Sequence, residues 1–412
     1  MQSIATKHAP DVRLPLVHIL SGALAAVLGG LCLLAWAPGL LAQPLGDFHT
    51  LAVTHLFTLG WLAMTLTGAS YQLVPVVLEV RLPSERLARA GYPVLAAGIA
   101  AMVAGFWTVR PLLLIAGATA VAAALSVYAV HITLTVLRSR AHRMYRLFFL
   151  GATAYLVVVL ALGVTMAANL RWGWVHIDLL PAHVVAAALG WLTLLAMGVT
   201  YKLVPMFALS HGHGEGQGTV VFGLTAGGAL LLFAGALDGW PPAALAAAGL
   251  VPLGAVVLFL RDQWIFFRTR YKPRLDVGLR LSALAFVYLG LVAALAWLSL
   301  AGLVRLGHGV LVILALIGWL GCLMGGQTYK IVPFLVWYHR YAGRAGREKV
   351  PLLREMYDER LAGFGMWALA AAAALLALGA ATGLSDLERL GALSWLVGYG
   401  ILGTNLVQVL RA

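Results

Sequence analysis

Histidines that fall inside long apolar segments are the residues of this sequence most able to carry chemistry. Four of them each precede a Gly-Trp pair, namely His49, His55, His183 and His308. Imidazole is a common protein ligand for haem iron, copper and zinc. An ionisable side chain at membrane depth is also costly, which makes it a candidate for function. These four histidines are therefore candidate ligands of a haem iron or a copper ion.

The four candidates differ in how deep they lie along their segments. His55 and His183 stand 5 and 7 residues before the glycine of their pair, which separates their depths by about 3 Å at the helical rise. His49 and His308 stand at the starts of their segments, so an ordinary helix-terminal role remains open for both. His18 and His131 fall near the opposite helix ends and suggest no site. His211 and His213 form a Gly-flanked loop pair, for which a solvated loop is the alternative to metal binding.

A motif that recurs three times surrounds these histidines. A Gly-Trp pair is followed by a glycine, a tyrosine ten residues after the tryptophan and a proline fourteen residues after it, at 60–75, 190–205 and 318–333. The tryptophans are spaced by 130 and 128 residues, which predicts repeats of about 15–137, 146–262 and 278–409. The simplest role of the motif is packing, because glycine lets helices approach closely and tyrosine favours the membrane interface.

Composition places these segments in a membrane. Hydrophobic residues make up 62% of the 412 and charged residues only 10%, so the chain could not cover itself with polar groups in water. We therefore predict an all-α integral membrane protein with one transmembrane domain, 1–412, and contact with the lipid bilayer. The twelve predicted spans are 15–41, 50–78, 90–108, 111–137, 146–169, 180–206, 219–237, 242–262, 278–302, 308–337, 361–382 and 387–409.

The basic residues are distributed unevenly over the predicted loops. Of the 28 Lys and Arg, 24 fall on one side and four on the other, and these four are Arg110, Arg171, Arg305 and Arg389. Cytoplasmic loops collect positive charge, so both termini are expected in the cytoplasm, and a bacterial inner membrane is the expected location. Anionic lipid head groups account for the net charge of +13 without a nucleic acid partner.

The second copy of the motif resembles a known sequence. The segment 182–205, which begins Ala-His-Val-Val and continues through Leu-Gly-Trp to Tyr-Lys-Leu-Val-Pro, resembles a haem-ligating helix of the haem-copper oxidase superfamily. Subunit I of the C-type oxidases is most similar, followed by the nitric oxide reductases. The resemblance implies twelve helices in three pseudo-repeats and haem near the outer side. Phe48-His49-Thr50 also resembles the start of the family's helix 2, whose histidine binds the low-spin haem.

The family's haem helix carries a His-x-His pair before Leu-Gly-Trp, and this chain keeps the pair only in part. His183 matches the first member and Val185 replaces the second, whereas His55 matches the second member in the first repeat. The third repeat has Leu311 and Ile313 at these positions, with His308 a turn earlier. The family's paired copper ligands are absent from 219–237, which contains no histidine.

The resemblance therefore implies a divergent relative without a complete haem–copper centre. It would hold haem b, with copper as an alternative, and serve in electron transfer or in the binding or chemistry of nitric oxide or oxygen. Its partners would be a redox protein or subunits of a respiratory complex, and an oxidoreductase activity remains open. The alternatives are a copper, metal or small-molecule transporter and a cofactor-free assembly partner. Acidic residues within the spans are scarce, with Asp262 and Glu388 at span ends, which disfavours a proton-coupled transporter.

Overall fold

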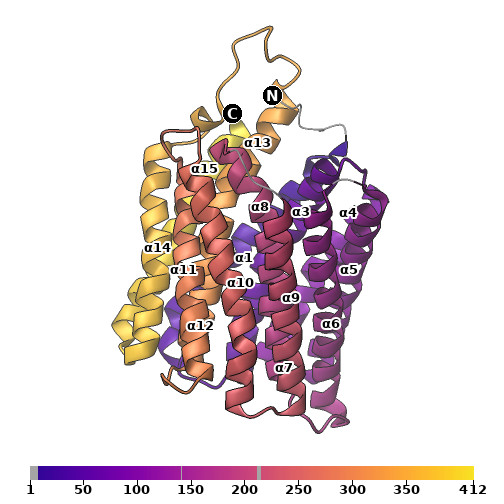
Figure 1. Cartoon of the computed structure of the whole chain (residues 1–412), viewed down its shortest axis with the longest axis vertical. Helices are drawn as coiled ribbons and strands as arrows, with labels where there is room; N and C mark the ends of the chain where they lie inside the picture. Colours follow the sequence, from indigo (N-terminus) through magenta and orange to yellow (C-terminus); the bar gives the residue numbers. More distant parts are fainter. Residues whose placement is uncertain (1–7, 141, 211–214) are drawn as a thin grey trace. The chain divides into compact units, whose positions relative to one another are not determined.

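Most of the described residues of the chain belong to helices. The computed structural model describes residues 8–140, 142–210 and 215–412, so Lys7, His211 and His213 lie outside the described residues. Within these ranges the chain forms helices and no β-strand, and most connections are short, apart from the long loop 342–358 between α13 and α14 (Figure 1). This is the architecture that lipid demands, because a helix pairs its backbone N–H and C=O groups within the segment.

Twelve of the helices in the described part of the chain are long and apolar enough to cross a membrane, which confirms the predicted number. Nine are single α-helices: α1 (Arg13–Leu40), α4 (Glu85–Trp107), α5 (Pro111–Arg138), α6 (Arg143–Trp172), α9 (Glu215–Asp238), α10 (Pro242–Arg268), α11 (Val277–Leu300), α14 (Glu359–Thr382) and α15 (Ser385–Arg411). A short 3₁₀ turn, η5 (Leu353–Glu355), precedes α14. The largest boundary difference among the ends is at α10, which continues to Arg268 where the sequence predicted an end at 262.

The other three spans, which carry the recurring motif, each contain a π-helical segment. They are α2–η2–α3 (Phe48–His55, Leu56–Ala63, Met64–Leu78), α7–η3–α8 (Leu180–Val185, Ala186–Thr193, Leu194–Ala208) and α12–η4–α13 (His308–Ile313, Leu314–Gly321, Cys322–Tyr341). Each π segment is eight residues long and holds the Gly-Trp pair at its fifth and sixth positions. Such wider turns are rare and occur frequently at functional sites. The motif thus marks a helix distortion that its residue types did not predict.

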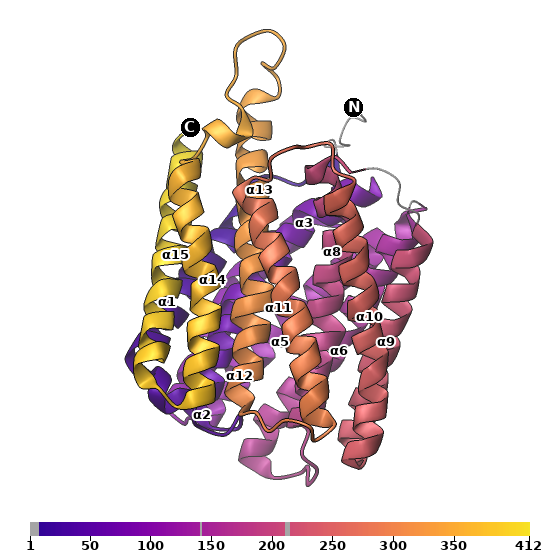
Figure 2. The same cartoon turned by 60° about the vertical axis from the view of Figure 1, so that its left-hand side comes forward.

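The helices group into two compact units. Unit 1 holds Ser70–Pro273 and Ala293–Arg305 with the described residues up to Pro10, and unit 2 holds Asp11–Ala69, Arg274–Val292 and Leu306–Ala412. Within unit 1, α5 packs against α4 and α6, and α9 against α10. Within unit 2, α15 packs against α1 and α14 (Figure 2).

Helix ends are fixed by capping groups outside the spans. Asp358 accepts hydrogen bonds from the backbone N–H groups of Arg360 and Leu361 at the start of α14. Asp47 accepts one from Thr50 N at 2.9 Å, and this bond holds the pKa of the Asp47 carboxyl below its usual value. At the other end of α14, Gly383 adopts φ +72°, a conformation that glycine takes without strain. The caps define where the chain turns between spans.

Glycine contacts bring the helices of each unit close together. A Cβ atom added at Gly326 would lie 2.6 Å from Gly278 O, and one at Gly198 would lie 2.6 Å from Phe148 Cβ. A Cβ at Gly68 would likewise lie 2.6 Å from His18 Cβ. These three are the motif glycines, and each is covered by the helix that opens its predicted repeat. The packing role predicted for them is therefore observed.

Gly326→Ala should destabilise the protein, because the new methyl group meets the backbone of α11, which cannot move as a side chain would. We expect a loss of about 1–3 kcal/mol, measured as a lower midpoint of thermal unfolding in detergent. Gly403→Ala in α15 is the matched control, since no heavy atom lies within 4 Å of its added Cβ. Equal midpoints for the two variants would contradict close α11–α13 packing.

Candidate functional site

Two of the four candidate histidines lie at helix starts. His49 is the second residue of α2 and His308 is the first residue of α12, and both side chains are exposed. His49 lies beside the capping carboxylate of Asp47. This placement is what a helix-terminal histidine would have, and it gives neither imidazole an enclosed environment.

His55 is held in a defined orientation. It is the last residue of α2, directly before η2, and its side chain is half-buried. Its Nδ1 donates a hydrogen bond to Leu51 O at 2.8 Å. A carbonyl only accepts, so Nδ1 carries a proton, and in the neutral imidazole the lone pair is therefore on Nε2. Histidine ligands of metals are commonly oriented by such a bond from the opposite nitrogen.

His183 occupies a comparable position in unit 1. It lies in α7, three residues before η3, and is half-buried. Gly163 of α6 faces its ring, because a Cβ added there would stand 3.4 Å from His183 Cε1. The absence of a side chain at Gly163 leaves room beside the imidazole. His55 and His183 thus share half-burial and a place just before a π segment.

The candidates do not form a multi-ligand metal cluster. His49, His55 and His308 belong to unit 2 and His183 to unit 1. Within residues 8–140, 142–210 and 215–412 there is no group of three or more His, Cys, Asp or Glu that could hold a metal ion. A haem needs only one or two axial protein ligands, so this finding bears on a bare metal ion more than on haem.

An apolar pocket lies in unit 2 among α1, α2, η2, α12 and η4. Its wall includes Thr50, Thr54 and Gly309, the sequence neighbours of the three candidate histidines of this unit, but not these histidines themselves. The rest of the wall is almost entirely aliphatic or aromatic: Leu33, Leu40, Leu41, Gln43, Leu45, Val53, Phe57, Val312, Ile313, Leu316 and Ile317. The almost entirely apolar wall suits an apolar molecule.

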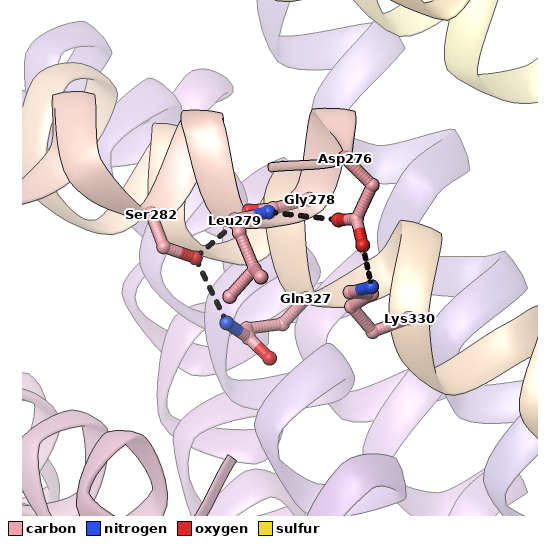
Figure 3. Close-up of polar contacts among 6 residues, drawn as sticks. All are labelled: Asp276, Gly278, Leu279, Ser282, Gln327 and Lys330. Atoms are coloured by element: carbon pink, nitrogen blue, oxygen red, sulfur yellow. Dashed lines mark hydrogen bonds and ion pairs between the residues drawn. The ribbon is translucent and has the colours of Figure 1, made fainter. Parts of the chain in front are cut away.

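A polar network of unit 2 joins α11 to α13 (Figure 3). Asp276 accepts a hydrogen bond from Leu279 N at 3.1 Å, at the start of α11, and forms an ion pair with Lys330. Gln327 Nε2 donates to Ser282 Oγ at 2.9 Å, and Ser282 Oγ donates to Gly278 O at 2.9 Å. Both ion-pair side chains are about nine-tenths buried. The network ties the motif helix to its neighbour.

The motif tyrosines of α8 and α13 contact polar side chains of the helix that closes their predicted repeat. Tyr201 OH donates to Asp262 Oδ2 at 2.8 Å in unit 1. Asn405 Nδ2 donates to Tyr329 OH at 3.1 Å in unit 2. All four side chains are less than a tenth exposed. The sequence placed these tyrosines at the membrane interface, and the structure adds a buried hydrogen bond to each.

The motif tyrosine of the first repeat has aromatic partners. The Tyr71 ring lies 5.5 Å from the Tyr128 ring and 6.1 Å from the His131 ring, measured between centroids. His131, which the sequence suggested was ordinary, is 2% exposed, and its Nδ1 is buried without a hydrogen-bond partner. His18 is equally buried, with Nδ1 bonded to Leu14 O at 2.8 Å. The most buried histidines are therefore not the four candidates.

Sequence reasoning missed the burial of acidic side chains. Asp262 and Glu388, which were placed at span ends, are each 4% exposed. The sequence does contain an indication that Asp262 lies inside a helix and not at its end. Residues 263–267 are apolar apart from Gln263, so the helix can continue beyond Asp262. The sequence could not predict which residue forms an ion pair with Lys330, because Asp276 lies 54 residues earlier in the chain.

Comparison with known proteins adds no relationship, because no family model matches this chain and no curated protein matches it.

Breaking the Asp276–Lys330 ion pair from one side should destabilise the protein by about 1–3 kcal/mol, because the remaining, largely buried charge loses this partner. Asp276→Asn is the sharper variant, since Asn can still cap α11. Combining it with Lys330→Met should recover part of the loss, measured by thermal unfolding. Asp386→Asn, in an exposed pair with Arg389, is the control and should change little. Strict additivity of the two single losses would argue against the pair.

Proposed function

We propose that this chain is an integral membrane haem protein that binds b-type haem through His55 and His183. The observation that carries the proposal is the orientation of His55, whose Nδ1–H is bonded to Leu51 O. That bond directs the Nε2 lone pair away from its own backbone, as required of an axial ligand. His49 and His308 fit the role less well because both are exposed at helix starts.

The donor set and its surroundings fit a haem group. Both proposed ligands are half-buried, so each ring can be enclosed on one side and reached on the other. The apolar pocket of unit 2 includes Val53 and Phe57, which stand two residues either side of His55 in the sequence, although His55 itself does not line it. Gly163 leaves space next to His183. His55 is proposed as a haem ligand within unit 2, and His183 as a haem ligand within unit 1.

We also propose that the fold consists of three four-helix repeats related to subunit I of the haem-copper oxidases. The support is the common register of the π segments, which begin at Leu56, Ala186 and Leu314, at intervals of 130 and 128 residues. A second recurrence supports it: Tyr155 covers Gly190 and donates to Ala226 O, and Tyr288 covers Gly318 and donates to Ala370 O. Repeated sequence positions thus coincide with repeated contacts.

A bound haem would supply one-electron transfer or the binding of a diatomic gas. The chain's own part would be to orient the imidazoles and to exclude water. The Leu51 carbonyl fixes the tautomer of His55. The buried rings of Phe57 and Trp61, whose centroids are 5.9 Å apart, belong to η2, which directly follows His55. The dry surroundings would set the reduction potential through low polarity.

The proposal is tested by the absorption spectrum of detergent-purified protein expressed with ample haem, oxidised and then reduced with dithionite. We expect a Soret band and sharp reduced α and β bands. His55→Ala and His183→Ala should each weaken haem affinity by about tenfold or more, measured as haem per protein. His339→Ala, an exposed residue, and His131→Ala are the controls and should keep their haem.

Equal haem content in all four variants would reject the ligand assignment. A featureless spectrum would reject haem altogether, and copper analysis and transport assays would then address the transporter alternative.

We further propose that both termini lie in the cytoplasm and that the protein resides in a bacterial inner membrane, on the strength of the charge asymmetry. In a background with Cys32 and Cys322 replaced by alanine, Leu303→Cys should react with a membrane-impermeant maleimide in intact cells. Ala345→Cys should react only after permeabilisation. Both positions are exposed. The reverse labelling pattern would invert the topology.

A further inference from the structure

Asp262 is an acidic side chain buried inside a membrane-spanning helix. It lies in α10, six residues before the end of the helix at Arg268, and is 4% exposed. Its neighbour on α8 is Tyr201, which donates a hydrogen bond to Oδ2 at 2.8 Å. The Tyr201 ring is packed in turn against the rings of Phe148, Phe259 and Phe266, with centroids 5.8, 5.4 and 6.1 Å away.

No cation of the described residues forms an ion pair with this carboxyl group. Across the described part of the chain, none of the ion pairs formed within 4.0 Å involves Asp262. The charged and titratable groups at this end of the described parts of α6, α8 and α10, apart from Tyr201, are Arg143, Tyr145, Arg146, Lys202, Arg261 and Arg268. Lys202 Nζ is directed to the Tyr145 ring, 5.9 Å from its centroid, and Arg261 and Arg268 are exposed. A single hydrogen bond from a neutral phenol does not compensate a buried negative charge.

The next residue adds a second unusual feature. Gln263 is 1% exposed, and both its Nε2 and its Oε1 are buried without a hydrogen-bond partner. Buried polar atoms are almost always paired, either with protein or with ordered water. The Gln263 amide, near the C-terminal end of α10, thus has two buried atoms whose hydrogen bonds are not supplied by side chains or backbone of the described residues.

The motif tyrosine of α13 in unit 2 has a neutral side chain as its partner. There the tyrosine is Tyr329 and its partner on the closing helix is Asn405, a neutral side chain of the same size, at 3.1 Å. Asn405 is 1% exposed, so the neutral version is at least as enclosed as the Asp262 version. A neutral side chain can therefore make this kind of contact with a motif tyrosine. The ionisable carboxyl group at position 262 suggests a role beyond helix packing.

We infer that Asp262 is a proton-exchange site, whose carboxyl group binds a proton from water at the basic end of α10 and releases it again while Tyr201 remains its hydrogen-bond partner. The ligand is the proton, because Asp262, which accepts from the Tyr201 hydroxyl group, belongs to no group of three or more His, Cys, Asp or Glu among the described residues that could hold a metal ion. The inference is independent of haem.

The test is infrared difference spectroscopy of the purified full-length protein between about pH 5 and about pH 9. A protonated carboxylic acid gives a C=O stretching band that shifts in deuterated water, and we expect such a band to vary with pH. Asp262→Asn, which keeps the shape of the side chain and can still accept from Tyr201, should abolish it. Glu388→Gln, at the other buried carboxyl group, should leave it unchanged.

A band that persists in Asp262→Asn would overturn the inference, as would the absence of any titrating carboxyl band in the wild-type protein. If Asp262→Asn does not fold, the wild-type protein decides the matter through a hydrophobic carbodiimide, which modifies protonated carboxyl groups in membranes. We then expect modification at Asp262, mapped by peptide mass, that declines as the pH rises. Modification elsewhere only would reject the site, whatever the result for haem.

Discussion

The exclusion of water from the hydrocarbon core of a membrane is the constraint on which the structure depends. Every backbone N–H and C=O at that depth must be paired within the protein, and helices do this locally. Even where the three motif helices change geometry, they do not break: η2, η3 and η4 keep their backbone hydrogen bonds in a wider π pattern. A distortion that preserves pairing is the form of irregularity that lipid tolerates.

The same constraint governs side chains. With no hydrophobic driving force between helices in lipid, association rests on close packing and buried hydrogen bonds. Gly326 against α11 provides the first, and the pairs Tyr201–Asp262 and Tyr329–Asn405 provide the second. Lys330 follows the rule as well, because its charge is buried only together with that of Asp276. Polar residues at helix ends therefore hold neighbouring helices in register.

Features that follow from local composition could be predicted from the sequence. The number of spans and the close approach at Gly68, Gly198 and Gly326 belong to this group, because hydropathy and glycine size are local properties. The length of α10 was predicted less well, because a charged residue such as Asp262 indicates the end of a membrane span unless a buried partner such as Tyr201 is known. That partner lies 61 residues away, and only the folded chain brings the two together.

The candidate site divides in the same way. Residue type and depth selected His55 and His183, and half-burial agrees with that selection, but the Nδ1 bond to Leu51 depends on a rotamer that spacing does not specify. The position of His131 near a helix end also suggested no functional site there, although its ring is almost fully buried. Enclosure depends on which helices surround a position, and the sequence predicts that helices exist more readily than which ones meet.

The three motif tyrosines show how one scaffold can separate structure from chemistry. All three are buried near the same end of their helices, which satisfies packing, but their partners differ in what they can do. Asn405 can only hold a hydrogen bond, whereas Asp262 can also change its charge. The Tyr71 position has His131, which can change its charge as well. Because the packing requirement is common to all three, the difference in ionisable chemistry is not explained by packing. Two of the three contacts, both in unit 1, thus retain groups that can exchange protons.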